Sequence, residues 1–593
     1  MSMAATVIGN GVSYQKNKWG CREVAPGSFR AIERDGYTVV LESNFADKDI
    51  VRESGARWRP ERKRWVISID RLPKLLGKIP NAEIDSEIYQ LVNGTNEALN
   101  ASIATSSEIA VPAPEGLSYL PYQLAGIQYV DWHNGVALMG DEMGLGKTIQ
   151  FLGYANLHPE MRPILIVCPA SLKRNWANET EKWLFGANVQ ILKSSREIQP
   201  FKNVVIINYD ILRSRLDELL EHKFQLVCFD EAHYLKNKSA IRTKAGLTLM
   251  KSVPHKILLT GTPILNRPME IFPLANALCP AVFPNEFQFG LRYAGGHKDT
   301  IYLRGQHGNT REVWNFDGAS NLAELNERLR SNCMVRRLKK DVLKDLPPKR
   351  RILVPLESSD SGVVKLYQDA EKAQAKAKAK AEKIKAKIAA VVDDDEKAKL
   401  IAELDNFLSR SVEAFFTEIV KLRKQAALAK LDHALEIFAD AAQQGKIVIF
   451  AHHHEVVDKL TEGLKERGFG VVALTGETPP DLRQGIIDRF QKDDKIQVFI
   501  GSLHAASQGI TLTAASNVYF LEIDWTPAIC MQAEDRCHRI GQKDSVSCYY
   551  LLLADTVEVN IAIKLENKLA VIEAAISGCD LDEVGFLKEM FDD

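Results

Sequence analysis

Between Leu120 and about Val354, short apolar runs rich in β-branched residues alternate with stretches of helical periodicity. The runs are Val136 to Met139, Ile164 to Cys168, Val204 to Asn208, Leu226 to Phe229 and Ile257 to Thr260. Strands that are apolar on both faces and joined by helical crossovers are typical of a parallel sheet covered on both sides. This stretch is therefore predicted to be an α/β domain.

The same alternation returns nearer the carboxyl end and predicts a second α/β domain of similar size. Its runs are Ile447 to Phe450, Val471 to Leu474, Val498 to Ile500, Val518 to Leu521 and Cys548 to Leu553. Ahead of both lies a shorter unit with a strand-like run at Tyr37 to Leu41, a short helix ending near Gly55 and a hairpin. The polar segment NGTNEALNASIATSSEIAVPAPEG follows this unit and is typical of a linker.

These patterns predict an α/β fold of two parallel-sheet lobes with helical insertions and a small N-terminal α+β module. The expected division is a module (1–90), a linker (91–117), a first lobe (118–355), a helical insertion (356–440), a second lobe (441–570) and a helical tail (571–593). The insertion contains EKAQAKAKAKAEKIKAKIAA, whose alanines and lysines favour helix but offer almost no apolar stripe. It is expected to project into solvent or to cross between domains, with its lysines forming either a solvated face or a DNA-contacting arm.

Composition narrows the class of protein. At 593 residues, with 46% hydrophobic and 26% charged residues, the chain can bury several cores and is not wholly disordered. A net charge of -1 means that any nucleic-acid site must be a local patch or a lined cleft. The nine cysteines contain no C-x-x-C pair, and no signal pattern or membrane-length apolar run is present. We therefore expect no membrane partner and a reducing compartment: cytoplasm or nucleoid in a prokaryote or virus, nucleus in a eukaryote.

The sharpest local signal is ALMGDEMGLGKTIQ, in which a strand runs into a glycine loop and then a helix. Gly144 and Gly146 allow backbone amides to approach phosphates, Lys147 neutralises their charge, and Thr148 offers a Mg²⁺ ligand. The full phosphate-loop pattern would have glycine at position 141, where this chain has Asp141. The stretch nevertheless predicts an ATP site.

Two further motifs complete the expected chemistry. Asp230 and Glu231 follow an apolar strand, so Asp230 can hold Mg²⁺ while Glu231 polarises the attacking water. In QAEDRCHRIGQ, within the second lobe, Arg536 and Arg539 are three apart and Gln542 follows. Such an arginine pair is ordinarily a surface ion pair. Beside the other motifs it instead predicts that both lobes close on one ATP, with Gln542 counted among the catalytic residues.

The ordered set of motifs resembles the Swi/Snf-related DNA translocases of helicase superfamily two. The resemblance runs from about residue 120 to 566 and rests on LPYQLAGIQYV, DEMGLGKTIQ, ILIVCPASLKRNW, FDEAHYLKN (a DEAH box), LTGTPILNRP, MVRRLKKDVLKDLPPK, IGSLHAASQGITLTAA and QAEDRCHRIGQ. It implies two RecA-like lobes, DNA-stimulated ATP hydrolysis with Mg²⁺, and sequence-independent binding of DNA through its backbone.

Several site residues are carried over from this resemblance alone. It implies that Gln123 recognises adenine and that Thr260 and Thr262 couple the nucleotide site to the DNA groove. The residues implied to follow one strand's phosphates along that groove are Ser171, Lys173, Ser502 and Thr513.

The resemblance fails in one loop. SLHAASQGI has His504, Ala506 and Ser507 where the branch usually carries an arginine and paired glycines, which puts one DNA contact in doubt. His504 is expected to be either a DNA contact or a packed loop residue. The run His452 to His454 is not expected to bind a metal, because neighbouring strand residues face opposite ways.

Within the branch, FGLRYAGGH, WNFDGASNLAELNERL and AEDRCHRIGQ are most similar to the annealing-helicase (HepA-related) group. The N-terminal hairpin turn is basic and is flanked by Trp58 and Trp65; its cations are Arg57, Arg59, Arg62, Lys63 and Arg64. Aromatic and arginine side chains together suit a DNA junction or a single strand. Alternatively, the tryptophans only form a small core.

The leading hypothesis is thus a double-stranded DNA translocase used for strand annealing or fork remodelling. A chromatin-type remodeller is the nearest alternative, although no histone-reading addition is recognisable. A strand-separating helicase would need a wedge hairpin, and none is evident in the sequence. A non-enzymatic nucleic-acid scaffold is disfavoured by the intact motif set.

Overall fold

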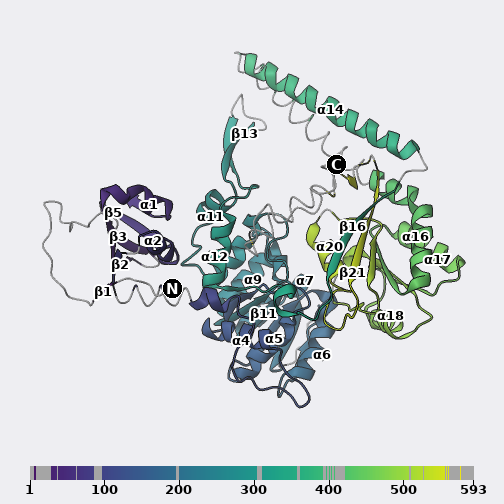
Figure 1. Ribbon diagram of the computed structural model, residues 1–593, viewed down its shortest axis with the longest axis horizontal. Helices are drawn as coiled ribbons and strands as arrows, with labels where there is room; N and C mark the ends of the chain where they lie inside the picture. Colours follow the sequence, from purple (N-terminus) through teal and green to yellow (C-terminus); the bar gives the residue numbers. More distant parts are fainter. Residues whose placement is uncertain are drawn as a thin grey trace.

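The computed structural model shows a small N-terminal unit beside two larger α/β lobes (Figure 1). It describes residues 6–8, 28–35, 38–61, 63–79, 81–85, 97–194, 200–302, 310–356, 361–391, 421–506, 509–524 and 526–554, with 88, 92, 396, 400, 403, 407, 556, 558, 559, 562 and 575. Arg62 and Ser507, two of the residues singled out in the sequence, lie outside the described residues.

The first lobe is built on a seven-stranded sheet in the order β15-β7-β12-β11-β8-β10-β9, with every pairing parallel. Its strands are β7 (Val136–Met139), β8 (Ile164–Cys168), β9 (Val189–Ile191), β10 (Val204–Asn208), β11 (Leu226–Asp230), β12 (His255–Leu259) and β15 (Met334–Val335). Alternate strand residues enter two separate apolar cores. Helices α4 (Pro121–Trp132), α5 (Lys147–Leu157) and α6 (Lys173–Trp183) pack on one face, and α9 (Ile241–Ser252), α10 (Phe272–Leu278) and α12 (Leu322–Asn332) on the other. The predicted parallel α/β arrangement is confirmed.

The second lobe repeats this plan with a six-stranded parallel sheet in the order β16-β21-β20-β17-β19-β18. Its strands are β16 (Lys349–Leu356), β17 (Ile447–Ala451), β18 (Val471–Leu474), β19 (Val498–Ser502), β20 (Asn517–Phe520) and β21 (Val546–Leu553). Helices α16 (Leu431–Gln444) and α17 (His454–Glu466) cover one face, and α18 (Pro480–Lys492) and α20 (Pro527–Glu534) the other.

The expected boundary at residue 355 is displaced. Strand β16 lies along β21 from the Lys349–Val546 pair to the Leu356–Leu553 pair, so the chain has already crossed into the second lobe. Its sequence, KRRILVPL, carries three cations ahead of its apolar residues, so it does not match the continuous apolar pattern of a buried strand. Arg351 on this strand is held by Glu534 of the second lobe.

The N-terminal unit is a six-stranded sheet in the order β1-β6-β2-β3-β5-β4. The strands are β1 (Thr6–Ile8), β2 (Ser28–Asp35), β3 (Thr38–Ser43), β4 (Arg57–Arg59), β5 (Arg64–Ser68) and β6 (Asn81–Asp85). Helices α1 (Lys48–Glu53) and α2 (Leu72–Lys78) pack on one face and close a small core. Strand β3, helix α1 and the β4–β5 hairpin correspond to the elements predicted from the sequence.

The segment expected to be a free linker, 91–117, is instead packed against the first lobe over its second half. Ala101, Val111 and Leu117 contact the core beneath α4 and α5. Ser102 is fully buried, and its carbonyl accepts a hydrogen bond from the Arg336 amide at 3.2 Å. Scattered small apolar residues can dock on a larger surface even when they form no periodic pattern, which is why composition misjudged this segment.

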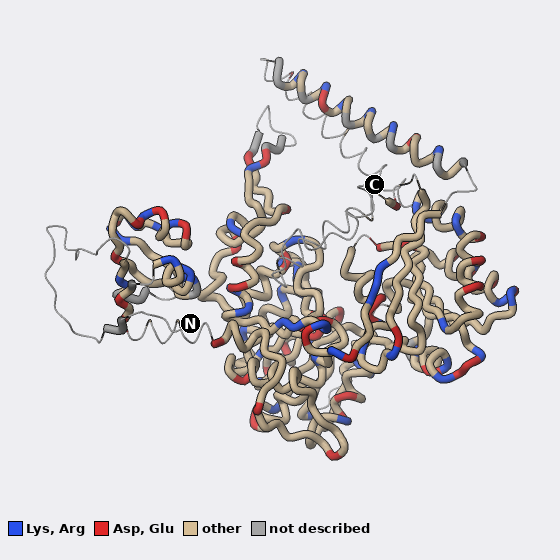
Figure 2. The backbone as a smooth tube through the Cα atoms, in the orientation of Figure 1, with Lys and Arg blue, Asp and Glu red and all other residues tan. Residues whose placement is uncertain are grey.

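Two elements project from the lobes. Helix α14 (Ser361–Ala390) extends away from the second lobe with lysines along its length (Figure 2). Its Ala381, Ile384 and Ile388 form a buried stripe with Leu400 and Phe407, so its apolar face is narrow but occupied. An antiparallel hairpin, β13 (His297–Tyr302) with β14 (Thr310–Asn315), projects from the first lobe (Figure 1). No hairpin of this kind is predicted from the sequence. Among the described helices, none combines the length and apolarity needed to span a bilayer.

Candidate nucleotide site between the lobes

The glycine loop after β7 leads directly into helix α5, which begins at Lys147. Gly144 and Gly146 have φ values of 86° and 73°, a region that favours glycine because it has no Cβ. A Cβ at Gly146 would lie 2.5 Å from the Gln123 side-chain amide, so glycine is also required there by space. The loop therefore presents the N-terminus of α5 with Thr148 in its first turn, the arrangement that binds phosphates.

Lys147 points back across this loop. Its Nζ donates to the carbonyls of Asp141 at 2.7 Å and Glu142 at 3.3 Å. Burial lowers the pKa of Lys147, and the nearby carboxylates Glu231, Asp141 and Asp230 oppose that shift. The Lys147 ammonium group, held here by backbone carbonyls, can turn to the phosphates of a nucleotide bound at the same loop.

Asp141 occupies the position where the phosphate-loop pattern has glycine, and the structure assigns it a specific partner. Its fully buried carboxylate accepts hydrogen bonds from the Arg337 backbone amide at 3.0 Å and from Arg337 Nε at 2.9 Å. Gln150 Nε2 donates to the same carboxylate at 3.0 Å. The departure from the pattern therefore ties the phosphate loop to the chain beyond β15.

The two acids after β11 lie in one buried cluster. Trp176 Nε1 donates to Asp230 Oδ2 at 2.7 Å, which orients that carboxylate. Glu231 has φ 50° and ψ 50°, an unfavourable conformation for a residue with a side chain. His233 Nδ1 lies 3.2 Å from Glu231 Oε2 and 3.1 Å from Thr260 Oγ1. The strained backbone aims Glu231 at the loop that carries Lys147.

The pKa values of this pair are pushed apart. Burial, then repulsion from Glu231, raises the pKa of Asp230 to about 7. Burial also acts to raise the pKa of Glu231, but His233, Lys147 and Arg536 outweigh it and lower that pKa. Two carboxylates crowded beside one buried lysine form a site whose charge a divalent cation would balance. The donor set of Thr148 and Asp230 is oxygen only, which suits Mg²⁺.

Thr260, Gly261 and Thr262 follow β12 and lie beside the same loop. A Cβ at Gly261 would approach Met143 Cγ to 2.4 Å and Lys147 Nζ to 3.4 Å, so glycine permits close contact with the phosphate loop. Thr260 is fully buried, and its hydroxyl also accepts from the Thr262 amide at 3.1 Å. Thr260 is thus linked to Glu231 through His233, and Thr262 bonds to Thr260 through its backbone amide; their coupling role stays a prediction.

The arginines of the second lobe face this cluster. Arg536 is near enough to lower the pKa of Glu231, and burial followed by repulsion from Arg539 lowers the pKa of Arg536 to about 9. Arg539 Cβ lies 3.3 Å from the position that a Cβ would take at Gly144. Arg539 donates to Thr511 Oγ1 at 2.8 Å and to the Ile510 carbonyl at 3.1 Å. The predicted convergence of the two lobes on one site is present in this structure.

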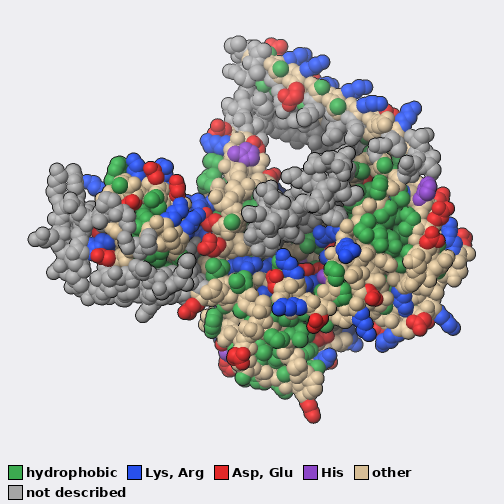
Figure 3. All heavy atoms as spheres, in the orientation of Figure 1, with side chains coloured by type: hydrophobic (Ala, Val, Ile, Leu, Met, Phe, Trp, Pro, Cys, Tyr) green, Lys and Arg blue, Asp and Glu red, His purple; other side chains and the backbone are tan. Residues whose placement is uncertain are grey.

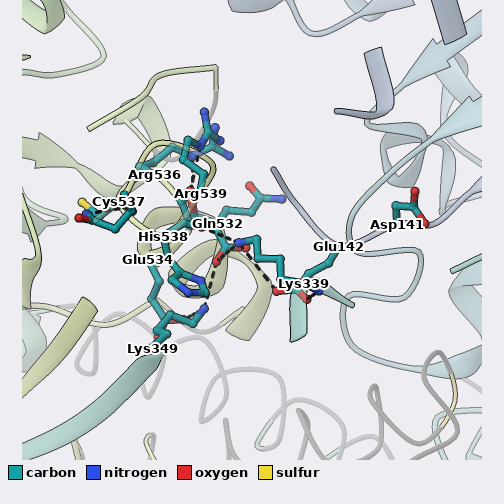
Figure 4. Close-up of polar contacts among 12 residues, drawn as sticks. Asp141, Glu142, Lys339, Lys349, Gln532, Glu534, Arg536, Cys537, His538 and Arg539 are labelled. Atoms are coloured by element: carbon teal, nitrogen blue, oxygen red, sulfur yellow. Dashed lines mark hydrogen bonds and ion pairs between the residues drawn. The ribbon is translucent and has the colours of Figure 1, made fainter. Parts of the chain in front are cut away.

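Lys339, to which the sequence assigned no role, joins the lobes beside these arginines (Figure 4). Its buried Nζ lies 2.9 Å from Asp535 Oδ1 and donates to the His538 carbonyl at 2.7 Å. Its own amide donates to Glu142 Oε2 at 2.7 Å. Lys339 stands in the quoted stretch MVRRLKKDVLKDLPPK, but only the fold reveals that it reaches across the cleft.

Gln542 was predicted to be catalytic; in this structure its side chain bonds to backbone groups of the second lobe, and its catalytic role stays a prediction. Its Nε2 donates to the carbonyls of Thr513 at 3.3 Å, Ala515 at 2.9 Å and Cys537 at 3.2 Å. Its Oε1 accepts from the amides of Lys543 and Asp544. With amide and oxygen both engaged internally, Gln542 has no group directed at the nucleotide site.

Gln123 lies against the phosphate loop. Its Oε1 accepts from the Leu120 amide at 2.9 Å, and its Nε2 donates to the Leu145 carbonyl at 3.4 Å. These contacts close the first turn of α4 and support the loop. Adenine recognition by Gln123 stays a prediction.

The residues expected along the DNA groove are distributed over both lobes. Ser171 is exposed in the 3-10 helix Ala170–Leu172 that precedes α6, and its neighbour Leu172 meets Gly509 of the second lobe, where a Cβ would approach it to 2.3 Å. Ser502 ends β19 and is buried, while Thr513 Oγ1 accepts from Gln491 Nε2 at 3.3 Å. Lys173 is less available than expected, because its Nζ donates to the Leu192 carbonyl and to Asn208 Oδ1.

The histidine run lies beyond the strand, because β17 ends at Ala451 and α17 begins at His454, so strand alternation does not explain how the three side chains separate. His453 Nδ1 lies 2.5 Å from Glu522 Oε1, whereas His452 turns toward His504, with ring centroids 5.5 Å apart. His504 Nε2 lies 3.2 Å from Asp524 Oδ2, and this partner raises the pKa of His504. His452, His504 and Asp524 bring one ligand atom each within 4.8 Å of one another, but the His504–Asp524 ion pair already accounts for two of them.

The N-terminal hairpin divides its aromatic and basic side chains between two faces. Trp58 is opposite Trp65 in register, with an edge-to-face ring contact at 5.6 Å, and Trp65 packs on the small core. Trp58 itself is 48% exposed, so it does not act as a core residue. Because side chains alternate along a strand, Arg57 and Arg59 project to the other face of β4. The sequence predicted only that these aromatic and basic side chains belong to one small sheet.

Comparisons with known proteins agree with the motif order. Residues 53–413 match the SNF2-related domain, and residues 427–541 match the helicase conserved C-terminal domain. A Caenorhabditis elegans homolog of SWI/SNF-related matrix-associated actin-dependent regulator of chromatin subfamily A-like protein 1 is 32% identical over 539 residues, covering 88% of this chain and 72% of the relative. The Xenopus tropicalis protein of that name is 30% identical over 537 residues, covering 88% of this chain and 52% of the relative.

A third relative is the mouse DNA annealing helicase and endonuclease ZRANB3, 33% identical over 470 residues, covering 77% of this chain and 41% of the relative. The chain spans about half the length of most of these relatives. Among solved structures, the Sulfolobus solfataricus SWI2/SNF2 ATPase core in complex with dsDNA matches with 23% identity and a TM-score of 0.36, covering 82% of this chain and 98% of that one.

Proposed function

This chain belongs to the SNF2-related family, and we propose that it is an ATP-dependent double-stranded DNA translocase with DNA-stimulated ATPase activity, used for strand annealing or fork remodelling. The observation that carries the proposal is the approach of Arg536 and Arg539 to the loop and acids of the other lobe. A site assembled from two lobes is completed only when they close, so hydrolysis and lobe movement are linked.

The chain's own residues divide the work of phosphoryl transfer. Lys147 and the N-terminus of α5 bind the phosphates, and Thr148 and Asp230 hold Mg²⁺, which supplies charge neutralisation at the phosphate oxygens. Glu231, whose pKa is lowered, stays ionised and orients the attacking water. Arg536 and Arg539 stabilise the charge that develops on the transferred group.

DNA is the expected partner, bound as duplex through its backbone. Ser171 and the loop at Gly509 lie where the two lobes meet, so a strand crossing there would contact both. A shift of one lobe against the other would then move the strand. The relatives named as annealing helicases favour rewinding as the use of this motion.

One observation supports a second candidate, strand separation. The β13–β14 hairpin projects from the first lobe, and Trp314 at its base is 37% exposed and packs edge-to-face on Phe287. A projecting hairpin is the element that a wedge would require. Chromatin remodelling remains the alternative for which no described residue offers separate support.

The test is an ATPase assay with duplex, single-stranded, forked and RNA ligands, paired with annealing and unwinding of the same forked substrate. A translocase used for annealing is stimulated by duplex and forked DNA and anneals complementary strands. Stimulation by single strands with net unwinding would favour the helicase instead. Absence of stimulation by every nucleic acid would overturn the proposal.

A further inference from the structure

A pocket of about 220 Å³ lies where the N-terminal module meets the first lobe. One wall is the face of the module's sheet opposite its helices, and the other wall is formed by α11 (Glu286–Tyr293), α12 and the turn before α11. Figure 3 shows basic side chains on the part of the module that faces the lobe. The charged residues that line the pocket are Arg57, Arg59, Arg71, Arg292 and Arg328.

The pocket carries a local excess of positive charge. Among the described residues that line it, no aspartate or glutamate is present. Glu324 lies behind the wall, where its carboxylate binds Arg71 and accepts from Arg292 Nε at 2.7 Å. Burial, together with repulsion from Arg292 and Arg328, lowers the pKa of Arg71 against the effect of Glu324. Glu324 therefore partly neutralises Arg71 and Arg292, while Glu61, 4.0 Å from Arg59, does not line the pocket.

The arginines reach the pocket from both sides for reasons of backbone geometry. Arg57 and Arg59 alternate with Trp58 on β4 and so share the face that looks toward the lobe. Arg328 is oriented by hydrogen bonds from its guanidinium to Tyr293 Oη at 3.0 Å and to the Val282 carbonyl at 3.2 Å. Arg292 and Arg328 come from the first lobe, whereas Arg57 and Arg59, which are exposed, come from the module.

Size and chemistry point to one kind of ligand. Pockets that enclose a nucleotide-sized or drug-sized molecule measure about 300 to 1,000 Å³, so this pocket is too small for a base with its sugar. Arginine forks match the oxygens of a phosphate. A pocket of this volume lined by arginines suits a single phosphate group.

We propose that this pocket binds one backbone phosphate of DNA and that the bound phosphate links the module to the first lobe. This inference rests on the proposed function, because it takes DNA as the partner. A strand leaving the motor and entering the pocket would be held by both units at once. The bound phosphate would then add a DNA-dependent contact to the Arg71–Glu324 ion pair that already joins the module to the lobe, which couples recognition of DNA structure to translocation.

The test compares Arg57→Gln/Arg59→Gln with Arg52→Gln in the full chain, measuring the salt dependence of binding to forked DNA. Arg52 is a matched control because it is exposed on α1, on the opposite side of the sheet, beside Asp49. Loss of one phosphate contact should reduce the slope of log K against log salt by about 0.9 on duplex or about 0.7 on a single strand. The Arg52→Gln control should retain both the wild-type slope and the wild-type DNA-independent ATPase activity.

Arg328→Gln tests whether both walls hold the same phosphate. If they do, Arg57→Gln/Arg59→Gln should have little further effect in the Arg328→Gln background, since contacting residues are not additive. Because Arg328 also bonds within the lobe, thermal unfolding of this variant is measured alongside. Full additivity of the two losses would overturn the shared pocket.

Two further measurements distinguish a DNA phosphate from free inorganic phosphate, and a failure of the pocket inference from a failure of the proposed function. Methylphosphonate substitution at the fork, which removes the phosphate charge, should abolish the difference in salt dependence between wild type and Arg57→Gln/Arg59→Gln. If that substitution has no effect and millimolar inorganic phosphate instead occupies the pocket, the ligand is free phosphate and the DNA link is overturned. If DNA stimulates the ATPase but the module variants keep the wild-type slope, the pocket inference fails and the proposed function survives. If DNA does not stimulate the wild-type ATPase, the proposed function itself fails.

Discussion

The carboxylate of Asp141 is held by Arg337, a residue 196 positions later in the chain, through the Arg337 backbone amide and guanidinium. Both side chains are almost fully buried. The pair fixes the start of the phosphate loop against the segment that leads out of the first lobe toward Lys339. A single ion pair thus connects the nucleotide loop with the bridge between the lobes.

This pairing predicts that Asp141→Gly is harmful, although it would restore the phosphate-loop pattern. Removing one partner of a buried ion pair leaves the other uncompensated, at a cost of about 3 to 5 kcal/mol. We expect a lower midpoint of thermal unfolding and weaker ATP binding, measured by melting curves and nucleotide titration. Asp141→Asn, which keeps the shape and one acceptor oxygen but loses the negative charge, serves as the milder control. An unchanged melting curve for Asp141→Gly would contradict the structural role of this pair.

Lys147→Ala and Glu231→Gln should each abolish ATP turnover but differ in binding. Loss of Lys147 removes charge neutralisation at the phosphates, so ATP affinity falls with the rate. Glu231→Gln is nearly isosteric and should retain ATP while failing to position water. Turnover in the presence of saturating duplex DNA and equilibrium binding of ATP are the two measurements. Near-wild-type turnover of Glu231→Gln would remove that residue from the mechanism.

Arg536→Ala and Arg539→Ala should lower kcat and leave ATP affinity comparatively intact. The second lobe supplies their charge mainly to the closed, reacting state, and arginines in comparable sites contribute roughly 10³-fold or more. Single-turnover hydrolysis with saturating DNA measures the effect. Normal hydrolysis by both variants would contradict the prediction that the second lobe contributes to hydrolysis.

Gln542→Ala should act on stability more than on chemistry. The buried amide serves three backbone carbonyls, and leaving such groups unsatisfied costs about 1 to 3 kcal/mol. We expect a lower unfolding midpoint with a kcat reduction much smaller than that of Arg539→Ala. A large loss of kcat at unchanged stability would restore the catalytic role predicted from the sequence.

A feature could be predicted from the sequence when the residues that specify it are close together in the chain. The buried strands, the glycine loop and the acids after β11 are each specified within a few consecutive residues, and their positions were predicted to within about two residues. Lys339, Arg337 and strand β16 could not be assigned in this way, because their partners lie far along the chain. The opposite facing of Trp58 and Arg57 required the strand register, which a basic turn flanked by aromatics does not reveal.

The final prediction concerns where the module can be removed. Deleting residues 1–110 would remove Ser102, which is buried and whose carbonyl accepts a hydrogen bond from the Arg336 amide beside the phosphate loop. A deletion of 1–95 keeps this contact and breaks mainly the Arg71–Glu324 link to the lobe. We therefore expect the 1–95 deletion to retain DNA-stimulated ATPase activity and the 1–110 deletion to unfold at a lower temperature.

Annealing by the 1–95 deletion then isolates the module's contribution. If Trp58 and the arginines of β4 hold a strand or junction, annealing or fork reversal should fall while the ATPase rate on the same forked substrate persists. Full-length Trp58→Ala and Arg52→Gln serve as the matched pair, because Trp58 is exposed on the hairpin and Arg52 on α1. Equal annealing by the full-length protein and the deletion would confine the module to a structural role. In that case only the motifs of the two motor lobes would support the resemblance to annealing helicases, because the module would contribute nothing to annealing.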